Sequence, residues 1–178
     1  MDLKNLRIPT LSPRTRDWQD SLGLSSQQVR QGVANHEAGH AAYTLLHSED
    51  MVLVWAGIMT DAEGYTSGMA IILPGKPADF REAVTLIGEM YAGEAAEEIL
   101  SGGPIPDGSL RDYADAAKAA KRFMGRNSPH LPQTLATAKM LARYVLAKHP
   151  AKLRRLANAL KRRKFLTGEE ARLIWNKR

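Results

Sequence analysis

The feature that most constrains the fold of this 178-residue chain is a long helical pattern that carries the pentapeptide HEAGH. A helical spacing is shared by Val29, Val33, His36, His40 and the apolar residues that follow up to about His47. Ser25 or Ser26 supplies an N-cap before them. The sequence therefore predicts a long helix with HEAGH in its middle.

The two histidines of HEAGH are placed to bind one metal ion. On a helix, His36 and His40 lie about 40° apart in azimuth and about 6 Å apart along the axis, so both imidazoles reach the same point. Zinc takes nitrogen ligands in a tetrahedron, and a catalytic site keeps the fourth position for water. Glu37 would stand beside that water as a general base. The alternative is two ordinary histidines on an amphipathic helix, which such a short motif does not exclude.

A third protein ligand must come from elsewhere in the chain. Because the chain has no cysteine, the ligand must be a His, Asp or Glu side chain. The segment GEAAEEIL offers Glu94, Glu97 and Glu98, and the segment SLRDYADAAK offers Asp112 and Asp115. Each carboxylate also has a purely structural interpretation, as a charge on a helix surface or as part of a helix cap. Spacing alone leaves this choice open.

The remainder of the chain predicts a mainly helical α+β domain. Residues 1–24 are rich in polar residues and predict an irregular N-terminal arm. The runs MVLVWAGI and YTSGMAIIL flank DAEG and predict a small sheet or hairpin. Helical patterns follow over about residues 80–100, 109–124, 132–148 and 151–163, and a TxxE capping box begins a last short helix. In the loop GRNSPHLP, His130 is a candidate for stabilising an oxyanion.

The net charge of +6 is concentrated near the C-terminus. From Ala147 to Arg178 there are 11 Lys or Arg residues and 2 Glu, whereas the other 146 residues carry a net charge of −3. A basic surface of this kind can bind nucleic acid or an acidic protein. An alternative function is therefore a non-proteolytic, zinc-containing binding or regulatory module that contacts such a partner through its basic C-terminal helices. No nucleic-acid recognition motif is present, however.

The sequence predicts a cytoplasmic location. No apolar run approaches the roughly 18 to 20 residues that span a bilayer, and the first 20 residues hold no apolar stretch typical of a secretion signal. The absence of cysteine also excludes disulfides. We therefore expect no membrane span.

Three segments in order resemble the zinc peptidase domain of the FtsH family of membrane-anchored AAA+ proteases. They are HEAGHA, AGEAAEEIL and DGSLRDYADAAKAAKRFM, with 72 residues from His40 to Asp112, and the ending TGEEARLIW is also similar. The resemblance covers about residues 25–178. It implies a helical, zincin-like metallopeptidase domain that binds one zinc ion per chain and cleaves unfolded or flexible proteins.

The resemblance also implies roles for particular residues. It makes Asp112 the third zinc ligand, Glu37 the general base, and Glu97 a residue that orients a liganding histidine. It further implies that the strand segment of Gly68, Met69, Ala70 and Ile71 binds the substrate, whose extended backbone would pair with the strand edge.

The sequence departs from this family in several places. It holds no GxxxxGK[ST] phosphate loop and no membrane anchor, so we expect a stand-alone, ATP-independent endopeptidase, with a separate adaptor or ATPase as a possible partner. Glu94 stands where the family has an arginine, and the stretch between Met124 and the helix near residue 132 is shorter. These differences leave the pocket shape and the oligomeric state open.

Overall fold

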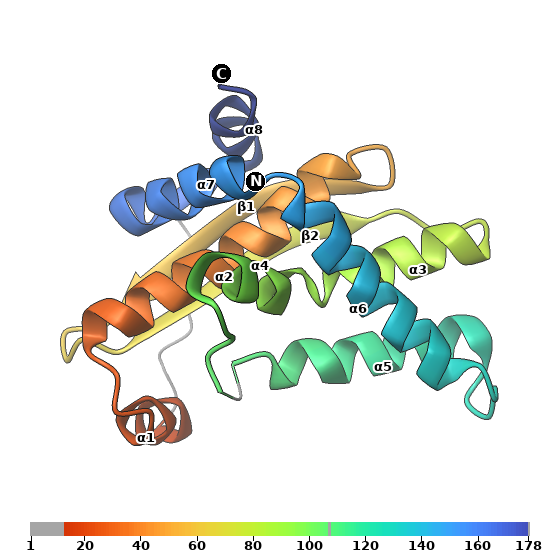
Figure 1. Cartoon of the computed structure of the whole chain (residues 1–178), viewed down its shortest axis with the longest axis horizontal. Coiled ribbons are helices and arrows are strands. Elements are labelled where there is room, and N and C mark those ends of the chain that lie inside the picture. The colour runs from red at the N-terminus through yellow and green to blue at the C-terminus, as the bar shows by residue number, and fades with distance from the viewer. Residues whose placement is uncertain (1–12, 107, 178) are drawn as a thin grey trace.

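The computed structural model describes residues 13–106 and 108–177, so residues 1–12 of the expected arm lie outside the described part. The fold is mainly helical with one small antiparallel sheet, which confirms the α+β prediction (Figure 1). The elements in chain order are α1 (Pro13–Ser21), α2 (Ser26–Leu46), β1 (Met51–Thr60), β2 (Thr66–Pro74), α3 (Phe80–Glu89), α4 (Ala92–Ser101), α5 (Leu110–Met124), α6 (Leu131–Ala147), α7 (Pro150–Arg163), β3 (Phe165–Thr167) and α8 (Gly168–Asn176).

Helix α2 is the central element of the fold. It contacts the sheet on one side and α4 and α7 on others (Figure 1). Ser25 caps its N-terminus in a reciprocal capping box with Gln28. At Gly39 a Cβ atom would overlap the carbonyl oxygen of Ala92, so the glycine is what allows α4 to lie this close to α2. The close approach brings α4 beside the HEAGH segment.

The sheet has the strand order β2-β1-β3, so β2 forms one of its edges. The predicted hairpin is confirmed: β1 and β2 are antiparallel, with Ile58 opposite Gly68 and Ala56 opposite Ala70. The short strand β3, which we did not predict, pairs with β1 on the other side. The edge strand β2 therefore keeps one side free of any strand partner in the described part of the chain.

The predicted helix over residues 80–100 is two helices. The N–H of Met90 donates to Ile87 O, and the N–H of Tyr91 donates to Gly88 O, so the chain tightens into a turn between α3 and α4. Both helices carry a buried apolar side, and this is why the sequence pattern looks continuous across the break. The turn gives α3 and α4 different directions.

The expectation of an irregular arm is wrong for residues 13–21, which form α1. This helix is attached to the β1–β2 turn: Arg16 forms an ion pair with Asp61 at 3.0 Å, and the Tyr65 hydroxyl donates to the Asp20 carboxylate at 2.9 Å. Arg16 and Asp20 therefore attach this helix to the turn between β1 and β2.

The basic C-terminal segment is part of the core and not a detachable tail. The fully buried side chains of α7 include Leu153, Leu156 and Leu160, and Trp175 of α8 is also buried. Several cations, such as Arg154 and Arg162, are exposed on α7, whereas the half-buried Lys161 donates a hydrogen bond to Gln31 of α2. Within residues 13–106 and 108–177, no helix combines the length and apolar character needed to cross a membrane.

Candidate metal centre

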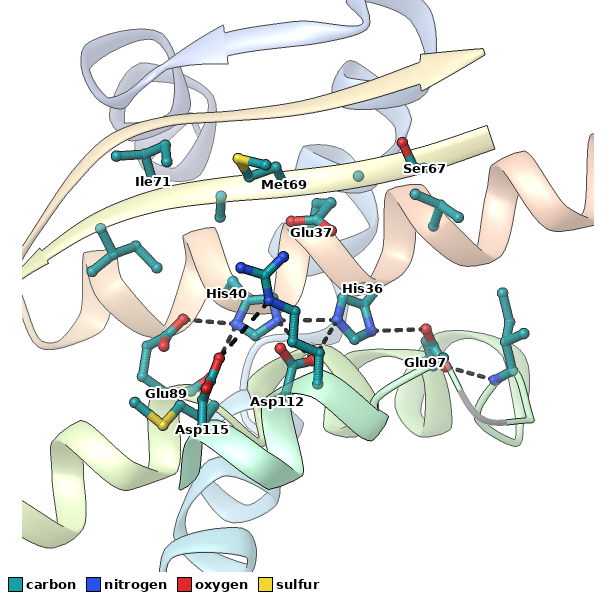
Figure 2. A pocket seen from close by; sticks show the side chains of 18 of the residues that line it. His36, Glu37, His40, Ser67, Met69, Ile71, Glu89, Glu97, Asp112 and Asp115 are labelled. Carbon is teal, nitrogen blue, oxygen red and sulfur yellow. Dashed lines mark hydrogen bonds and ion pairs between the residues drawn. The ribbon is translucent and has the colours of Figure 1, made fainter. Parts of the chain in front are cut away.

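His36 and His40 of α2 and Asp112 in the first turn of α5 meet at one point (Figure 2). His36 Nε2 lies 3.0 Å from Asp112 Oδ2 and 3.1 Å from His40 Nε2, and the third side of this triangle is 3.7 Å. A tetrahedral zinc ion with bonds of about 2.0–2.1 Å separates neighbouring ligand atoms by roughly 3.3 Å. The spacing of these three atoms therefore fits such an ion, and imidazole and carboxylate ligands suit zinc.

Two glutamates contact the imidazole rings at Nδ1, on the side away from the point where the Nε2 atoms meet. Glu97 of α4 lies 3.0 Å from Nδ1 of His36, and Glu89 at the end of α3 lies 2.7 Å from Nδ1 of His40. Glu97 is itself fixed, because its second oxygen accepts a 2.6 Å hydrogen bond from the N–H of Ile105. When each Nδ1–H donates to its glutamate, the Nε2 lone pairs are directed at the shared point, as metal-ligating histidines require. The tautomer is inferred here from these hydrogen bonds.

Among the candidate carboxylates, only Asp112 reaches the point where the two Nε2 atoms meet, because Glu97 contacts His36 at Nδ1. Glu94 forms an ion pair with Lys139 at 2.8 Å, Glu98 lies 3.5 Å from Arg143, and Asp115 pairs with Lys118 at 2.8 Å. Asp112 also has no capping role that would explain it, because the Ser109 side chain makes no cap hydrogen bond. The structure thus selects Asp112 as the third potential ligand among the described residues.

Close packing at two glycines shapes the site. At Gly93 of α4 a Cβ atom would overlap the imidazole of His36, and at Gly68 of β2 it would overlap the side chain of Glu37. Glu37 is buried and points towards β2, while the two histidines and Asp112 lie on the other side of it (Figure 2). Its carboxylate accepts no hydrogen bond from the described residues. It is therefore free to act on a molecule in the adjoining cavity.

The carboxylates around the histidines favour positive charge at their meeting point. Burial opposes protonation of His36, but hydrogen bonds with Asp112 and Glu97 raise the pKa of its imidazole to about 9. Burial also opposes protonation of His40, yet the nearby charge of Glu89 and hydrogen bonds with Asp112 and Glu89 raise its pKa as well. Such surroundings stabilise a bound cation for the same electrostatic reason.

The pKa values of the two acidic groups Glu37 and Asp112 shift in opposite directions. Burial raises the pKa of Glu37, and the two imidazoles offset only part of this effect. For Asp112, burial favours the neutral form, but hydrogen bonds with His36 and His40 outweigh it and lower the pKa. The Asp112 carboxylate is therefore held as an anion, whereas the buried Glu37 binds a proton more readily than an exposed glutamate does.

A cleft of about 560 Å³ lies between the edge of β2 and the start of α5. It is lined by the three potential ligands, by Glu37 and by the predicted substrate strand, namely Gly68, Met69, Ala70 and Ile71. An extended chain in this cleft would lie against both the strand edge and Glu37. The substrate role of the strand stays a prediction.

Sequence reasoning missed Glu89 and misplaced one histidine. Glu89 lies in what we expected to be the middle of a continuous helix, and no local pattern marks the turn that brings it to His40. His130 is exposed and does not line the cleft. It follows the far end of α5, about 18 Å along the helix from Asp112 at 1.5 Å per residue, so the expected oxyanion role has no support.

Comparison with models of known protein families gives no match, and comparison with curated proteins gives none either. The geometry of the site and the resemblance of its motifs therefore carry the functional proposal.

The Glu97→Gln variant is expected to bind zinc about 10- to 100-fold more weakly, because a neutral amide is a poorer acceptor for His36 Nδ1–H and leaves the ring less basic. Competition with a chromogenic zinc chelator measures the dissociation constant. The neighbouring Glu98→Gln variant is the control, since Glu98 faces Arg143 and not the histidines. Equal zinc affinity in wild type and Glu97→Gln would contradict the orienting role.

If the chain cleaves peptides as the family resemblance implies, the Gly68→Ala variant is expected to lower cleavage at least about tenfold while zinc stays bound, because the added methyl group displaces the Glu37 carboxylate. Cleavage rates and zinc content measured on the same preparation separate the two effects. If the methyl group acts through Glu37, it adds no further loss in a Glu37→Gln background. Additive losses in the double variant would show that Gly68 acts independently of Glu37.

Proposed function

We propose that this chain is a zinc-dependent endopeptidase that hydrolyses peptide bonds in unfolded or flexible proteins, as a relative of the FtsH-family peptidase domain. The observation that carries the proposal is the convergence of His36, His40 and Asp112 beside Glu37, whose carboxylate faces an open cleft. A bound zinc ion would supply Lewis acidity, which makes water more acidic and polarises a carbonyl group.

The protein side chains then have distinct tasks. Glu37 takes a proton from the attacking water and passes it to the leaving amine, as a buried general base and acid. Glu97 and Glu89 keep the two imidazoles in one orientation through Nδ1. None of these tasks needs a side chain of the substrate.

The edge of β2 supports a substrate that is extended and unfolded. A strand edge binds any peptide through backbone hydrogen bonds, with little sequence preference. A folded protein has its backbone groups already paired, so only a flexible segment can add itself to the edge. Unfolded chains and flexible regions are therefore the proposed substrate class.

The alternative of a binding module explains less of the site. The exposed cations of α7 and α8 would suit an acidic partner, but a purely structural zinc site has no use for a buried carboxylate such as Glu37 beside a cleft. Deletion from Ala147 cannot test this alternative, because it removes buried core leucines such as Leu153 and Leu160. Charge reversal at exposed Arg154 and Arg162 is the cleaner variant.

Digestion of unfolded casein by the purified chain, with ATP omitted, tests the proposal. We expect one zinc per chain, casein fragments that accumulate with time, loss of cleavage after chelation and recovery when zinc is restored. Intact casein in the presence of fully zinc-loaded protein would contradict the proposed function, and salt-sensitive binding to an acidic partner would then favour the binding module.

A further inference from the structure

The side chain of Gln19 in α1 covers part of the edge of β2. Its Oε1 accepts a 3.0 Å hydrogen bond from the N–H of Thr66, and its Nε2 donates to the carbonyl oxygen of the same residue. Gln19 is only 5% exposed, so this pair is shielded from water. A neighbouring strand would make the same two hydrogen bonds to Thr66. The amide of Gln19 therefore takes the place of a strand at this point.

The backbone N–H and C=O groups of successive β2 residues point alternately towards β1 and away from it, so the residues that face away from β1, as Thr66 does, can be identified. The N–H of Asp61 donates to Tyr65 O at 2.9 Å, so the carbonyl of Tyr65 faces β1 and the groups of Thr66 face outward. Backbone groups of successive residues in a strand point to opposite sides. Those of Gly68, Ala70 and Ile72 therefore also face outward, and no described residue pairs with them.

The covered end of the edge lies close to Glu37. Gly68 is the position at which a Cβ atom would overlap Glu37, and Thr66 is two residues away, or about 7 Å along the strand. On the other side of Gly68, Ala70 and Ile72 continue along the cleft. The uncovered part of the β2 edge therefore ends before Thr66 on one side of Glu37, whereas on the other side it continues through Ala70 and Ile72.

We infer that Gln19 ends the peptide-binding edge of β2, so that a substrate strand pairs with Gly68, Ala70 and Ile72 and cannot continue along Thr66. This inference rests on the proposed peptidase function. It makes Gln19 a specificity-determining residue: the enzyme gains backbone pairing from only about two substrate residues on one side of the scissile bond, and from more residues on the other side.

The competing explanation is that Gln19 only anchors α1, and three variants separate the two roles. Gln19→Ala removes both the hydrogen bonds and the bulk that covers Thr66. Gln19→Met keeps comparable bulk but removes the hydrogen bonds. Tyr65→Phe removes another contact of α1, the one with Asp20, and leaves the edge of β2 as it is.

The experiment measures kcat/KM for a casein-derived peptide lengthened one residue at a time, at its N-terminal or its C-terminal side. For wild type we expect lengthening beyond about two residues to have no further effect on one of the two sides. In Gln19→Ala, further residues on that side alone should raise kcat/KM about three- to tenfold, because the freed Thr66 adds backbone hydrogen bonds. Gln19→Met also frees the backbone groups of Thr66 but keeps bulk beside them, so its gain on that side should be smaller than that of Gln19→Ala. Tyr65→Phe should behave as wild type. No gain in Gln19→Ala, the same gain in Tyr65→Phe, or equal changes on both sides would overturn the inference.

Amide hydrogen exchange gives a second readout that needs no cleavage. It uses the same peptides with zinc-loaded Glu37→Gln protein, with and without Gln19→Ala. The peptide should slow exchange at Gly68, Ala70 and Ile72 in both proteins, and it should slow exchange at Thr66 only where Gln19 has been replaced, since Gln19 already protects that amide in the free protein. Protection at none of the three outward amides would overturn the inference. If this pattern is seen while wild type cleaves no peptide, the proposed hydrolysis fails and the assignment of the edge stands.

Discussion

Replacement of Glu37 by glutamine is expected to lower kcat/KM for casein cleavage by about 10²- to 10⁴-fold, the usual contribution of a general base, while zinc remains bound. The amide of glutamine has nearly the same size as the carboxylate, so it fits the space beside Gly68, but it cannot accept a proton from water. Because Glu37 is not among the three converging groups, its loss should leave zinc affinity nearly unchanged.

The measurement pairs initial cleavage rates with zinc content for the same samples. Glu98→Gln serves as a matched control, because it makes the same chemical change at a residue that pairs with Arg143. Glu37→Gln protein that binds zinc and still cleaves at the wild-type rate would remove Glu37 from the mechanism.

Replacement of Asp112 by asparagine is expected to weaken zinc binding by more than about 100-fold, the upper range for loss of an outer partner, since here a direct ligand is lost. Asp112 supplies the only carboxylate among the three converging groups, and its negative charge offsets part of the charge of a divalent cation. Without it, two imidazoles alone would hold the ion, and cleavage should fall together with zinc content.

The control is Asp115→Asn, one turn further along α5. Asp115 lines the same cleft but pairs with Lys118, so its replacement should leave the zinc dissociation constant within about threefold of wild type, in line with the small energies of exposed ion pairs. Equal zinc affinity in Asp112→Asn and Asp115→Asn would show that Asp112 is not a ligand.

The local part of the site could be predicted because helix geometry depends on spacing alone. His36 and His40 are four residues apart, so any helix through HEAGH puts them on one side with Glu37 next to them. The start of the helix was also predictable, since Ser25 is an N-cap residue and forms a capping box with Gln28.

The distant part of the site depends on tertiary structure. Asp112 and Asp115 lie on the same helix, and only the placement of α5 against α2 decides which of them meets the histidines. The resemblance of the surrounding motif pointed to Asp112, but spacing did not. Glu89 gave no signal, because the turn after α3 arises from backbone hydrogen bonds within an apolar pattern that continues without interruption.

The glycine at position 68, within a predicted strand, could have indicated that another group packs closely against the strand there. A glycine within a strand often marks a close approach of another group, and Gly68 has this role for Glu37. Gln19, in contrast, could not be predicted from the sequence. The polar segment around it shows no periodicity, and its contact with Thr66 depends on how α1 lies against the sheet.

The most direct test of the central claim is a crystal of the zinc-loaded protein measured on both sides of the zinc absorption edge. We expect one anomalous peak per chain, about 2.0–2.2 Å from Nε2 of His36, Nε2 of His40 and a carboxylate oxygen of Asp112. A zinc peak elsewhere in the molecule, with these three side chains contacting no metal, would contradict it.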